Sequence, residues 1–534
     1  MTRFDLYLAC QPASLPASKM SAPQIVKDFV FDLHEAVKMS QKAEDVQHLY
    51  ELKFKEITDK LYSQGAWPDA SALAPECRGD EDFLCFYKEM SYRHFFTWNK
   101  KATVLDMNAA YLNYVQLFEY VLRVADVEGS LALTTPWIND IIQEFVYQFQ
   151  GFCQFRSQVH KRSIDELALL DANKSAWAMP KVLGLLYKLV ASGKSATSSA
   201  ITQQFSVFAS IELVRLECLI GDYSSSLEQA KSIFERDVSA LLVQTPLCHV
   251  NLYYHAGLSH LMLREHLRYT HSLIHSFITF LKLYLTLHPL QYSAIEVFSE
   301  IILHVHRVLR NSRLHLSQVL KILDKILVLT AIASALSPGV KLDDQVRELI
   351  QTKGSSRPDD QRREAVEGKW TEKLRRLGEG DMMIFTDLFE QNCPKFICPT
   401  VPDYNLGAND YNIEAFNNQV SIFMSEVHQY GDVLKIRSYL KMYSSIEVSK
   451  LARFNNVSEA TLLSYLMSYK HKTVQGGVNV SDVKYKLRGS SLHIDSPNLT
   501  KDKDLEIERQ FSSGIRKNVE IRSNLAKYFN KHNL

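Results

Sequence analysis

Apolar residues recur at helical spacing along most of this 534-residue chain, and this spacing restricts the chain to a mostly helical fold. The clearest element follows Thr135-Pro136, where we expect Thr135 to be the N-cap and the proline to occupy the first helical position. Its apolar face comprises Ile138, Ile141, Ile142, Phe145, Phe149 and Phe152. A stripe of this width must be buried, and we interpret it as a core helix rather than a groove for a partner.

A helical repeat follows a linker of small residues at 191 to 200. A helix ending at Leu219-Ile220 runs into Gly221-Asp222-Tyr223, and the helical period then resumes. This helix-turn-helix punctuation is typical of tetratricopeptide-like repeats, and a degenerate second turn is expected at residues 264 to 266. Residues 352 to 369 combine Gly, Ser and Pro with dense mixed charge, which indicates an exposed loop. Helical periodicity returns from Trp370 to Phe389, and the prolines at 394 and 399 mark an ordered crossing.

The pattern changes at Asp432. Three short helices are predicted around residues 436 to 443, 448 to 452 and 459 to 469, with Ser458 capping the third. In the next segment Val483, Tyr485 and Leu487 alternate with Lys484, Lys486 and Arg488, a period of two that predicts a half-buried strand. Gly489-Ser490-Ser491 then turns the chain into a second strand. Three helices followed by a hairpin is the order of a winged helix.

We therefore predict four regions. They are an N-terminal helical region (1–190), a helical-repeat region (201–431), a winged helix (432–498) and a C-terminal amphipathic helix (499–534). The last helix carries a drifting apolar stripe made of Ile507, Phe511, Ile515, Val519, Leu525 and Tyr528.

Charge and cysteine usage exclude several classes of protein. The net charge of +1 gives no electrostatic case for wrapping nucleic acid, although residues 432 to 534 carry 18 Lys and Arg against 10 Asp and Glu. Eight cysteines without a Cys-x-x-Cys pair favour a reducing, cytoplasmic compartment. We expect no signal peptide, because Asp5 interrupts the short apolar run at the start, and no membrane segment.

Three motifs resemble catalytic or metal sites only in part. Gly193-Lys194-Ser195 matches the end of a phosphate-binding loop, but Lys188 stands where that loop needs its first glycine. Gly257-Leu-Ser259 begins like a nucleophile elbow that Leu261 fails to complete. A histidine-rich stretch from 249 to 315 lacks a third metal ligand that can be named. We expect no catalytic residue, no metal and no cofactor.

The winged helix also raises the question of nucleic acid. We expect the outward face of its third helix to present Thr461, Tyr465 and Ser468, which argues against reading of base edges. Lys484, Lys486 and Arg488 on the wing are possible contacts for RNA phosphates, and a solvated strand face is the equal alternative.

Several segments, taken in order, resemble the L-subunit family of the third eukaryotic translation initiation factor, a family with a PCI-type winged helix. They are Trp67-Pro68-Asp69-Ala70, Tyr87-Lys88-Glu89 with Tyr92-Arg93-His94, residues 140 to 150, Leu219 to Tyr223, Cys393 to Phe396 with Val401-Pro402, Ile436 to Lys441, Lys450 to Ala452, and Lys470 to Lys472. Against that family we expect a missing acidic, tyrosine-rich N-terminal extension and a shorter connection at 191 to 200.

The resemblance implies a non-catalytic scaffold subunit of a multi-subunit initiation factor on the small ribosomal subunit, next to other PCI subunits and the K subunit. We expect contacts in a helical bundle through the stripe from Ile507 to Tyr528, and the alternative is that this last helix folds back on its own wing. We expect Val483, Tyr485 and Leu487 to shape an edge of the winged helix. The alternatives are a PCI subunit of the proteasome lid or the signalosome, or a PCI adaptor that binds messenger RNA.

Overall fold

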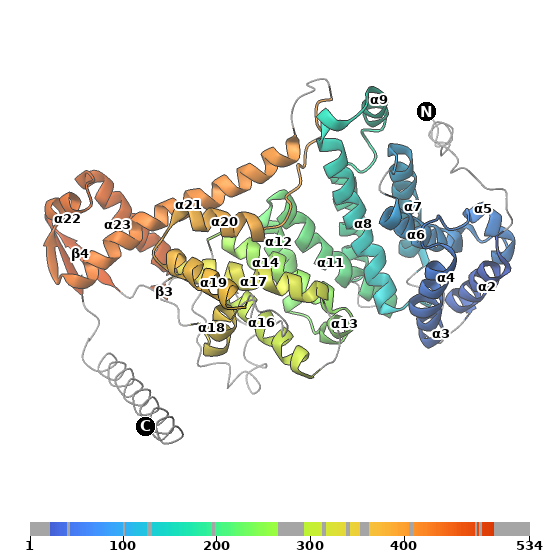
Figure 1. Cartoon of the computed structure of the whole chain (residues 1–534), viewed down its shortest axis with the longest axis horizontal. Coiled ribbons are helices and arrows are strands. Elements are labelled where there is room, and N and C mark those ends of the chain that lie inside the picture. Colours follow the sequence, from blue (N-terminus) through green and yellow to red (C-terminus); the bar gives the residue numbers. More distant parts are fainter. Residues whose placement is uncertain are drawn as a thin grey trace, which may run out of the picture. The chain divides into compact units, whose positions relative to one another are not determined.

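A computed structural model gives the fold of the chain (Figure 1). It describes residues 22–39, 43–99, 102–124, 131–194, 198–264, 293–311, 317–337, 342–352, 363–404, 410–475, 478–479 and 483–495. The described residues up to Met424 form one compact unit, and those from Ser425 onward form a second. The predicted fold class is confirmed, since helices dominate and a small sheet lies near the end of the described chain.

The first unit begins with a group of short helices followed by two longer ones. These are α2 (Gln24–Met39), α3 (Ala43–Gln47), the π-helical turn η1 (His48–Lys53), α4 (Phe54–Leu61), α5 (Ala70–Leu73), the 3₁₀ turn η2 (Ala74–Cys77), α6 (Glu81–Trp98) and α7 (Val104–Val124). Buried Trp67 stacks on Phe54 with ring centroids 4.9 Å apart, and the Tyr87 hydroxyl donates a hydrogen bond to the Pro68 carbonyl at 2.6 Å. One of the segments that resembles the family therefore lies in this core.

Helix α8 (Thr135–Ser157) packs between α7 on one side and α11 on the other (Figure 1). All six residues of the predicted stripe, from Ile138 to Phe152, are at most 3% exposed, so the interpretation as a core helix is confirmed. The predicted cap is wrong by one residue. Thr134 is the N-cap, and its side chain accepts a hydrogen bond from the backbone of Trp137, because the chain is already helical at Thr135.

The repeat region begins with helices that pack as successive hairpins. The elements that follow α8, as far as Met262, are η3 (Val159–Lys161), α9 (Ile164–Ala172), α10 (Met179–Ser192), α11 (Ala200–Ile220), α12 (Tyr223–Phe234), α13 (Ser239–Gln244) and α14 (Pro246–Met262). The predicted turn between α11 and α12 is confirmed. Gly221 adopts φ of +87°, a conformation that favours glycine, and Asp222 caps the next helix through the backbone of Ser225.

The rest of the first unit contains α16 (Ala294–Asn311), α17 (Ser317–Ala335), α18 (Asp344–Gln351), α19 (Arg363–Gly378) and α20 (Met382–Asn392). The prediction of a loop across 352 to 369 is wrong at its end, because α19 already begins at Arg363. Arg, Glu, Ala and Lys are strong helix formers, so dense mixed charge alone did not identify a loop. The second repeat turn predicted at 264 to 266 lies almost entirely outside the described residues.

The crossing around Cys393 is ordered, as predicted. Phe396 and Ile397 are buried, and the Ile397 amide donates to the carbonyl of Leu219 at 2.9 Å. The Tyr254 hydroxyl donates to the carbonyl of Asn392 at 2.6 Å. The segment is therefore held against the repeat helices.

The second unit contains the winged helix. Its elements are the C-terminal part of α21 (Tyr411–Met442), β1 (Ser445–Glu447), α22 (Val448–Phe454), α23 (Glu459–Thr473), β2 (Val474–Gln475), β3 (Val478–Asn479), β4 (Lys484–Arg488) and β5 (Ser491–Asp495). The first helix of the winged helix is thus not short, as predicted, but is the end of a helix of 32 residues. One antiparallel sheet has the strand order β1-β5-β4, and a second pairs β2 with β3. Strands β1, β2 and β3 were not predicted from the sequence.

No helix within the described ranges is long and apolar enough to span a lipid bilayer.

Candidate functional site

The core of the winged helix is built by residues from three helices and the hairpin. Ile436 and Leu440 of α21 pack with Leu451 of α22 and with Leu462 and Leu466 of α23. Ser458 caps α23 as predicted, because its hydroxyl accepts a hydrogen bond from the Thr461 amide at 3.1 Å. This core gives the hairpin a rigid support.

Strand β4 is an edge strand of the sheet, paired on one side to β5. Val483, just before the strand, and Tyr485 within it are 5% and 9% exposed, and the Tyr485 hydroxyl donates to the carbonyl of Leu466. The predicted burial of Leu487 is wrong, since its side chain is 50% exposed. Leu487 lies two residues before the turn at Gly489 and outside the hydrophobic core, so the alternation ends before the strand does.

Lys486 and Arg488, on the opposite face of β4, are both exposed, and Lys484 lies in the same strand. The Lys470 ammonium of α23 lies 5.6 Å from the centroid of the Tyr485 ring, on the inward side of the strand. Exposed cations are therefore present on the wing, at the positions predicted for contact with RNA phosphates.

The outward face of α23 differs from the prediction. Tyr465 packs against the core, and Thr461 and Ser468 are only partly exposed. The exposed positions of the helix are Leu463 and Met467, at 37% and 61%, together with Glu459, Ala460, Ser464, Lys470 and His471. Helix α23 is oriented so that Leu462, Leu466 and Tyr469 are buried. The residue that follows each of them in the sequence is exposed. The exposed face therefore combines apolar and charged side chains, and α23 contains none of the Arg, Asn or Gln residues that make the commonest bidentate contacts with bases.

The predicted bundle contacts all lie outside the described residues. They are Ile507, Phe511, Ile515, Val519, Leu525 and Tyr528.

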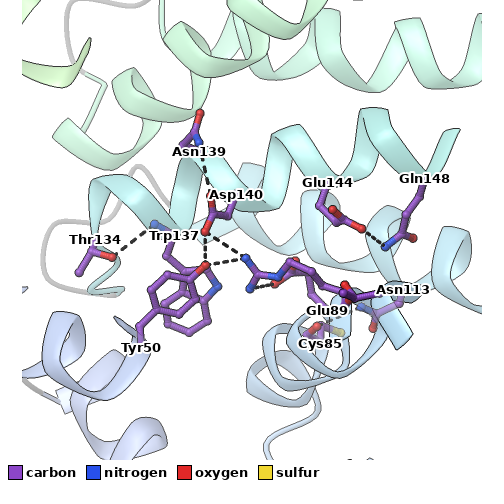
Figure 2. A network of polar contacts seen from close by, with 12 residues as sticks. Tyr50, Cys85, Glu89, Asn113, Thr134, Trp137, Asn139, Asp140, Glu144 and Gln148 are labelled. Atoms are coloured by element: carbon purple, nitrogen blue, oxygen red, sulfur yellow. Dashed lines mark hydrogen bonds and ion pairs between the residues drawn. The ribbon is translucent and has the colours of Figure 1, made fainter. Parts of the chain in front are cut away.

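A buried polar network in the first unit was not foreseen (Figure 2). Tyr50 of η1 stacks on Trp137 of α8 with ring centroids 4.8 Å apart, and its hydroxyl donates to Asp140. Arg93 of α6 donates to the Tyr50 hydroxyl, to Asp140 at 3.2 Å and to Glu89 at 3.3 Å. One guanidinium therefore connects three elements that are distant in the sequence.

Glu89 is the most deeply buried acid of this network, with no exposed surface. Burial raises its pKa to about 7, although the Arg93 charge acts in the opposite direction. The Trp137 indole lies close to this carboxyl group and also lowers its pKa. The one sequence signal for this site was a Glu and an Arg one turn apart in a largely apolar helix, and both lie within segments that resemble the family.

The partial catalytic motifs serve packing in this fold. Gly193 follows the end of α10, and a Cβ built there would lie 2.2 Å from the Cβ of Ser206, so no phosphate-binding loop opens at this point. Ser259 lies within α14 with no exposed surface, and its hydroxyl pairs with that of Ser226 at 3.0 Å. A buried hydroxyl inside a helix cannot act as the exposed nucleophile of a hydrolase.

The described cysteines, and His249 with His304, are also held in packed surroundings. His249 and His304 lie with ring centroids 4.7 Å apart, and burial lowers the pKa of His249 to about 4. Burial raises the pKa to about 12 for the thiols of Cys77, Cys153, Cys218 and Cys393. Thiols with so high a pKa are poor nucleophiles at neutral pH. Among the described side chains, no group of three or more His, Cys, Asp or Glu is arranged to hold a metal ion.

Known proteins match this chain over most of its length. The family model described as RNA polymerase I-associated factor PAF67 matches residues 106–292 and 284–513. Eukaryotic translation initiation factor 3 subunit L of Nematostella vectensis is 32% identical over 475 residues, which cover 85% of this chain and 82% of the relative. The proteins of the same name from Homo sapiens and Xenopus tropicalis are both 29% identical over 492 residues, covering 84% of this chain and 79% and 80% of the relatives.

The chain belongs to the family of eukaryotic translation initiation factor 3 subunit L. The resemblance inferred from short colinear segments is therefore confirmed. The relatives of the subunit L family are named as parts of a translation initiation factor, and this agreement does not favour the alternative assignments to the proteasome lid or the signalosome. The winged helix and the part of the helical unit from residue 106 onward lie within the residues that the family model matches.

Proposed function

We propose that this chain is a non-catalytic scaffold subunit of translation initiation factor 3, which binds the small ribosomal subunit in the cytoplasm and supports initiation of protein synthesis. The relationship to subunit L proteins across 85% of the chain is the observation that carries the proposal. Buried thiols and the helical setting of Ser259 support a role without catalysis. We propose the K subunit and other PCI subunits as neighbours.

Burial of complementary surfaces is the proposed mechanism of assembly. Strand β4 presents an edge to which another chain can add a strand, with Val483 and Tyr485 anchoring it from the core side. Leu463 and Met467 of α23 are exposed apolar side chains of the same unit, and we propose that a partner also covers them. The stripe from Ile507 to Tyr528 is proposed to enter a helical bundle formed with other subunits.

The first prediction concerns this stripe. A tagged chain in which Ile507, Phe511 and Ile515 are each replaced by Asp is expected to lose the other initiation-factor subunits in a pull-down, because charged residues cannot enter an apolar bundle. Deletion of residues 501 to 534 is expected to have the same effect. The matched control replaces Glu508, Ser512 and Arg516 by Asp. It places three Asp residues one position after the stripe residues and should leave recovery of the other subunits unchanged.

Two outcomes would contradict the proposal at different levels. Full recovery of the complex by the deleted chain would show that the tail is not the bundle contact. Recovery of proteasome-lid or signalosome proteins by the intact chain, in place of initiation-factor and small-ribosomal-subunit proteins, would reject the function itself.

We also propose a nonspecific RNA contact through Lys484, Lys486 and Arg488. Exposure of Lys486 and Arg488 on the wing favours it, and the C-terminal part of the chain carries an excess of basic residues. Phosphate contact of this kind would hold RNA without reading its sequence.

A further inference from the structure

The polar network of Figure 2 contains more acidic groups than its one guanidinium can neutralise. Asp140 and Glu144 lie on α8, and Glu89 faces them from α6, while Arg93 is the only basic group among the described residues that the network's hydrogen bonds reach. The carboxylate of Glu144 is bound by the neutral amide of Gln148 at 3.1 Å. With all three acids ionised, this largely buried cluster would carry a net charge of minus two.

Such an excess of charge is unfavourable in a protein interior, because burial removes the water that would otherwise solvate each carboxylate. Protonation of one acid removes part of this excess charge at the smallest cost in free energy. Glu89 is the acid with no exposed surface, whereas the Asp140 side chain is 40% exposed. The geometry therefore places the extra proton on Glu89.

We propose that protonated Glu89 is a pH-sensitive latch that keeps η1 docked against α6 and α8, and that release of its proton loosens this docking. Arg93 is shared between Glu89 on one side and Tyr50 and Asp140 on the other. When Glu89 ionises, it attracts the guanidinium and repels Asp140 and Glu144. The bonds that hold Tyr50, and with it the stack on Trp137, then weaken.

The groups that face Glu89 support this assignment. Burial is the largest cause of the raised pKa of Glu89. Arg93 on its own helix lowers this pKa, Glu144 and Asp140 on α8 raise it, and the Trp137 indole of α8 lowers it. Tyr50 of η1 and Tyr114 of α7 also lie close, and burial raises the pKa of both hydroxyls, so both stay neutral near pH 7. Glu144 has a raised pKa as well, caused first by burial, and it provides a matched control.

The direction of the effect follows from these shifts. The pKa of Glu89 in the folded chain, about 7, is above its ordinary value of 4.5, so the folded state binds a proton that the unfolded chain releases. The contribution of Glu89 to the docking of η1 is therefore fully present below about pH 4.5 and is lost as pH rises through about 7. Above that range no further loss from Glu89 is expected.

Hydrogen exchange on the full-length chain tests the latch. Protection of the amides in residues 48 to 61, corrected for the intrinsic effect of pH on exchange, is expected to fall by up to about tenfold between pH 6 and pH 8. Glu89→Gln, which cannot lose a proton, should keep its protection constant over this range. Glu144→Gln should retain the fall, shifted to lower pH, because it removes a negative charge that raises the pKa of Glu89.

The proposal is overturned if the unmodified chain shows no change in protection over this range, a result that does not depend on whether any variant folds. It is also overturned if Glu144→Gln abolishes the fall, or if Glu89→Gln retains it.

Discussion

Gly257 decides how closely α14 approaches α16. A Cβ built at this position would lie 2.2 Å from a ring carbon of Phe298, and Phe298 has no exposed surface. Real side chains never approach so closely, so the ring or one of the helices would have to move. The glycine that begins a broken nucleophile motif in the sequence is therefore present for helix packing.

Replacement of Gly257 by Ala is expected to destabilise the chain by about 1–3 kcal/mol, because overpacking outweighs the better helix propensity of alanine. Gly184 is the matched control. It lies within α10, where a Cβ in its place would have no other atom within 4 Å, so Gly184→Ala should be neutral or stabilising by up to about 1 kcal/mol. Urea unfolding followed by circular dichroism compares the two variants, and equal effects would contradict this account of Gly257.

Among the elements, strand β4 shows how burial can differ between residues of one apparent stripe. Val483 is 5% exposed and belongs to the hydrophobic core, whereas Leu487 is 50% exposed beside the turn. The two side chains are of similar hydrophobicity and share one face in the sequence pattern. Only the three-dimensional position of the helices decides which of them is covered.

Val483→Ala is accordingly expected to destabilise the winged helix by about 1–2 kcal/mol, since it removes two buried methyl groups. Leu487→Ala should change stability by no more than about 0.5 kcal/mol, because its side chain is largely solvated. Amide exchange in α23 of the full chain, in which Leu466 accepts the Tyr485 hydrogen bond, measures both effects. A larger loss for Leu487→Ala would show that the exposed leucine is not free of the core.

Elements with strong local signals were predictable from the sequence. Ser458 and Gly221 were recognised because capping and left-handed turns need particular residues. Strand β1 has three residues, too few for a periodic signal, and Arg363 to Lys369 are charged enough to resemble a loop although they are helical. The network of Figure 2 was missed because Tyr50, Arg93 and Asp140 meet only in the folded chain.

At the scale of the whole molecule, charge is unevenly distributed. The chain as a whole carries a net charge of +1, yet residues 432 to 534 hold 18 Lys and Arg against 10 Asp and Glu, so the preceding part is net acidic. An acidic part repels phosphates and a basic part attracts them. Any RNA contact should therefore depend on where a charge is changed, not only on the total.

The double variant Lys486→Glu/Arg488→Glu is expected to weaken binding of single-stranded RNA to the full chain. It should also reduce the magnitude of the slope of log affinity against log salt by about 1.4, which is about 0.7 for each lost phosphate contact on a single strand. The control Lys55→Glu/Lys194→Glu changes the total charge equally at exposed positions of the first unit, and should leave the slope unchanged. Equal effects of both variants, or no binding by the unmodified chain, would reject a phosphate site on the wing.

The seven cysteines of the described chain are all buried, and they lie in successive elements of the helical unit, from Cys77 near the start to Cys398 in the crossing segment. A brief pulse of an alkylating reagent will therefore modify each of them only when the element that contains it unfolds locally. Mass spectrometry of the modified peptides can then follow the order in which these elements unfold. The native cysteines are the reporters, so no engineered label is needed.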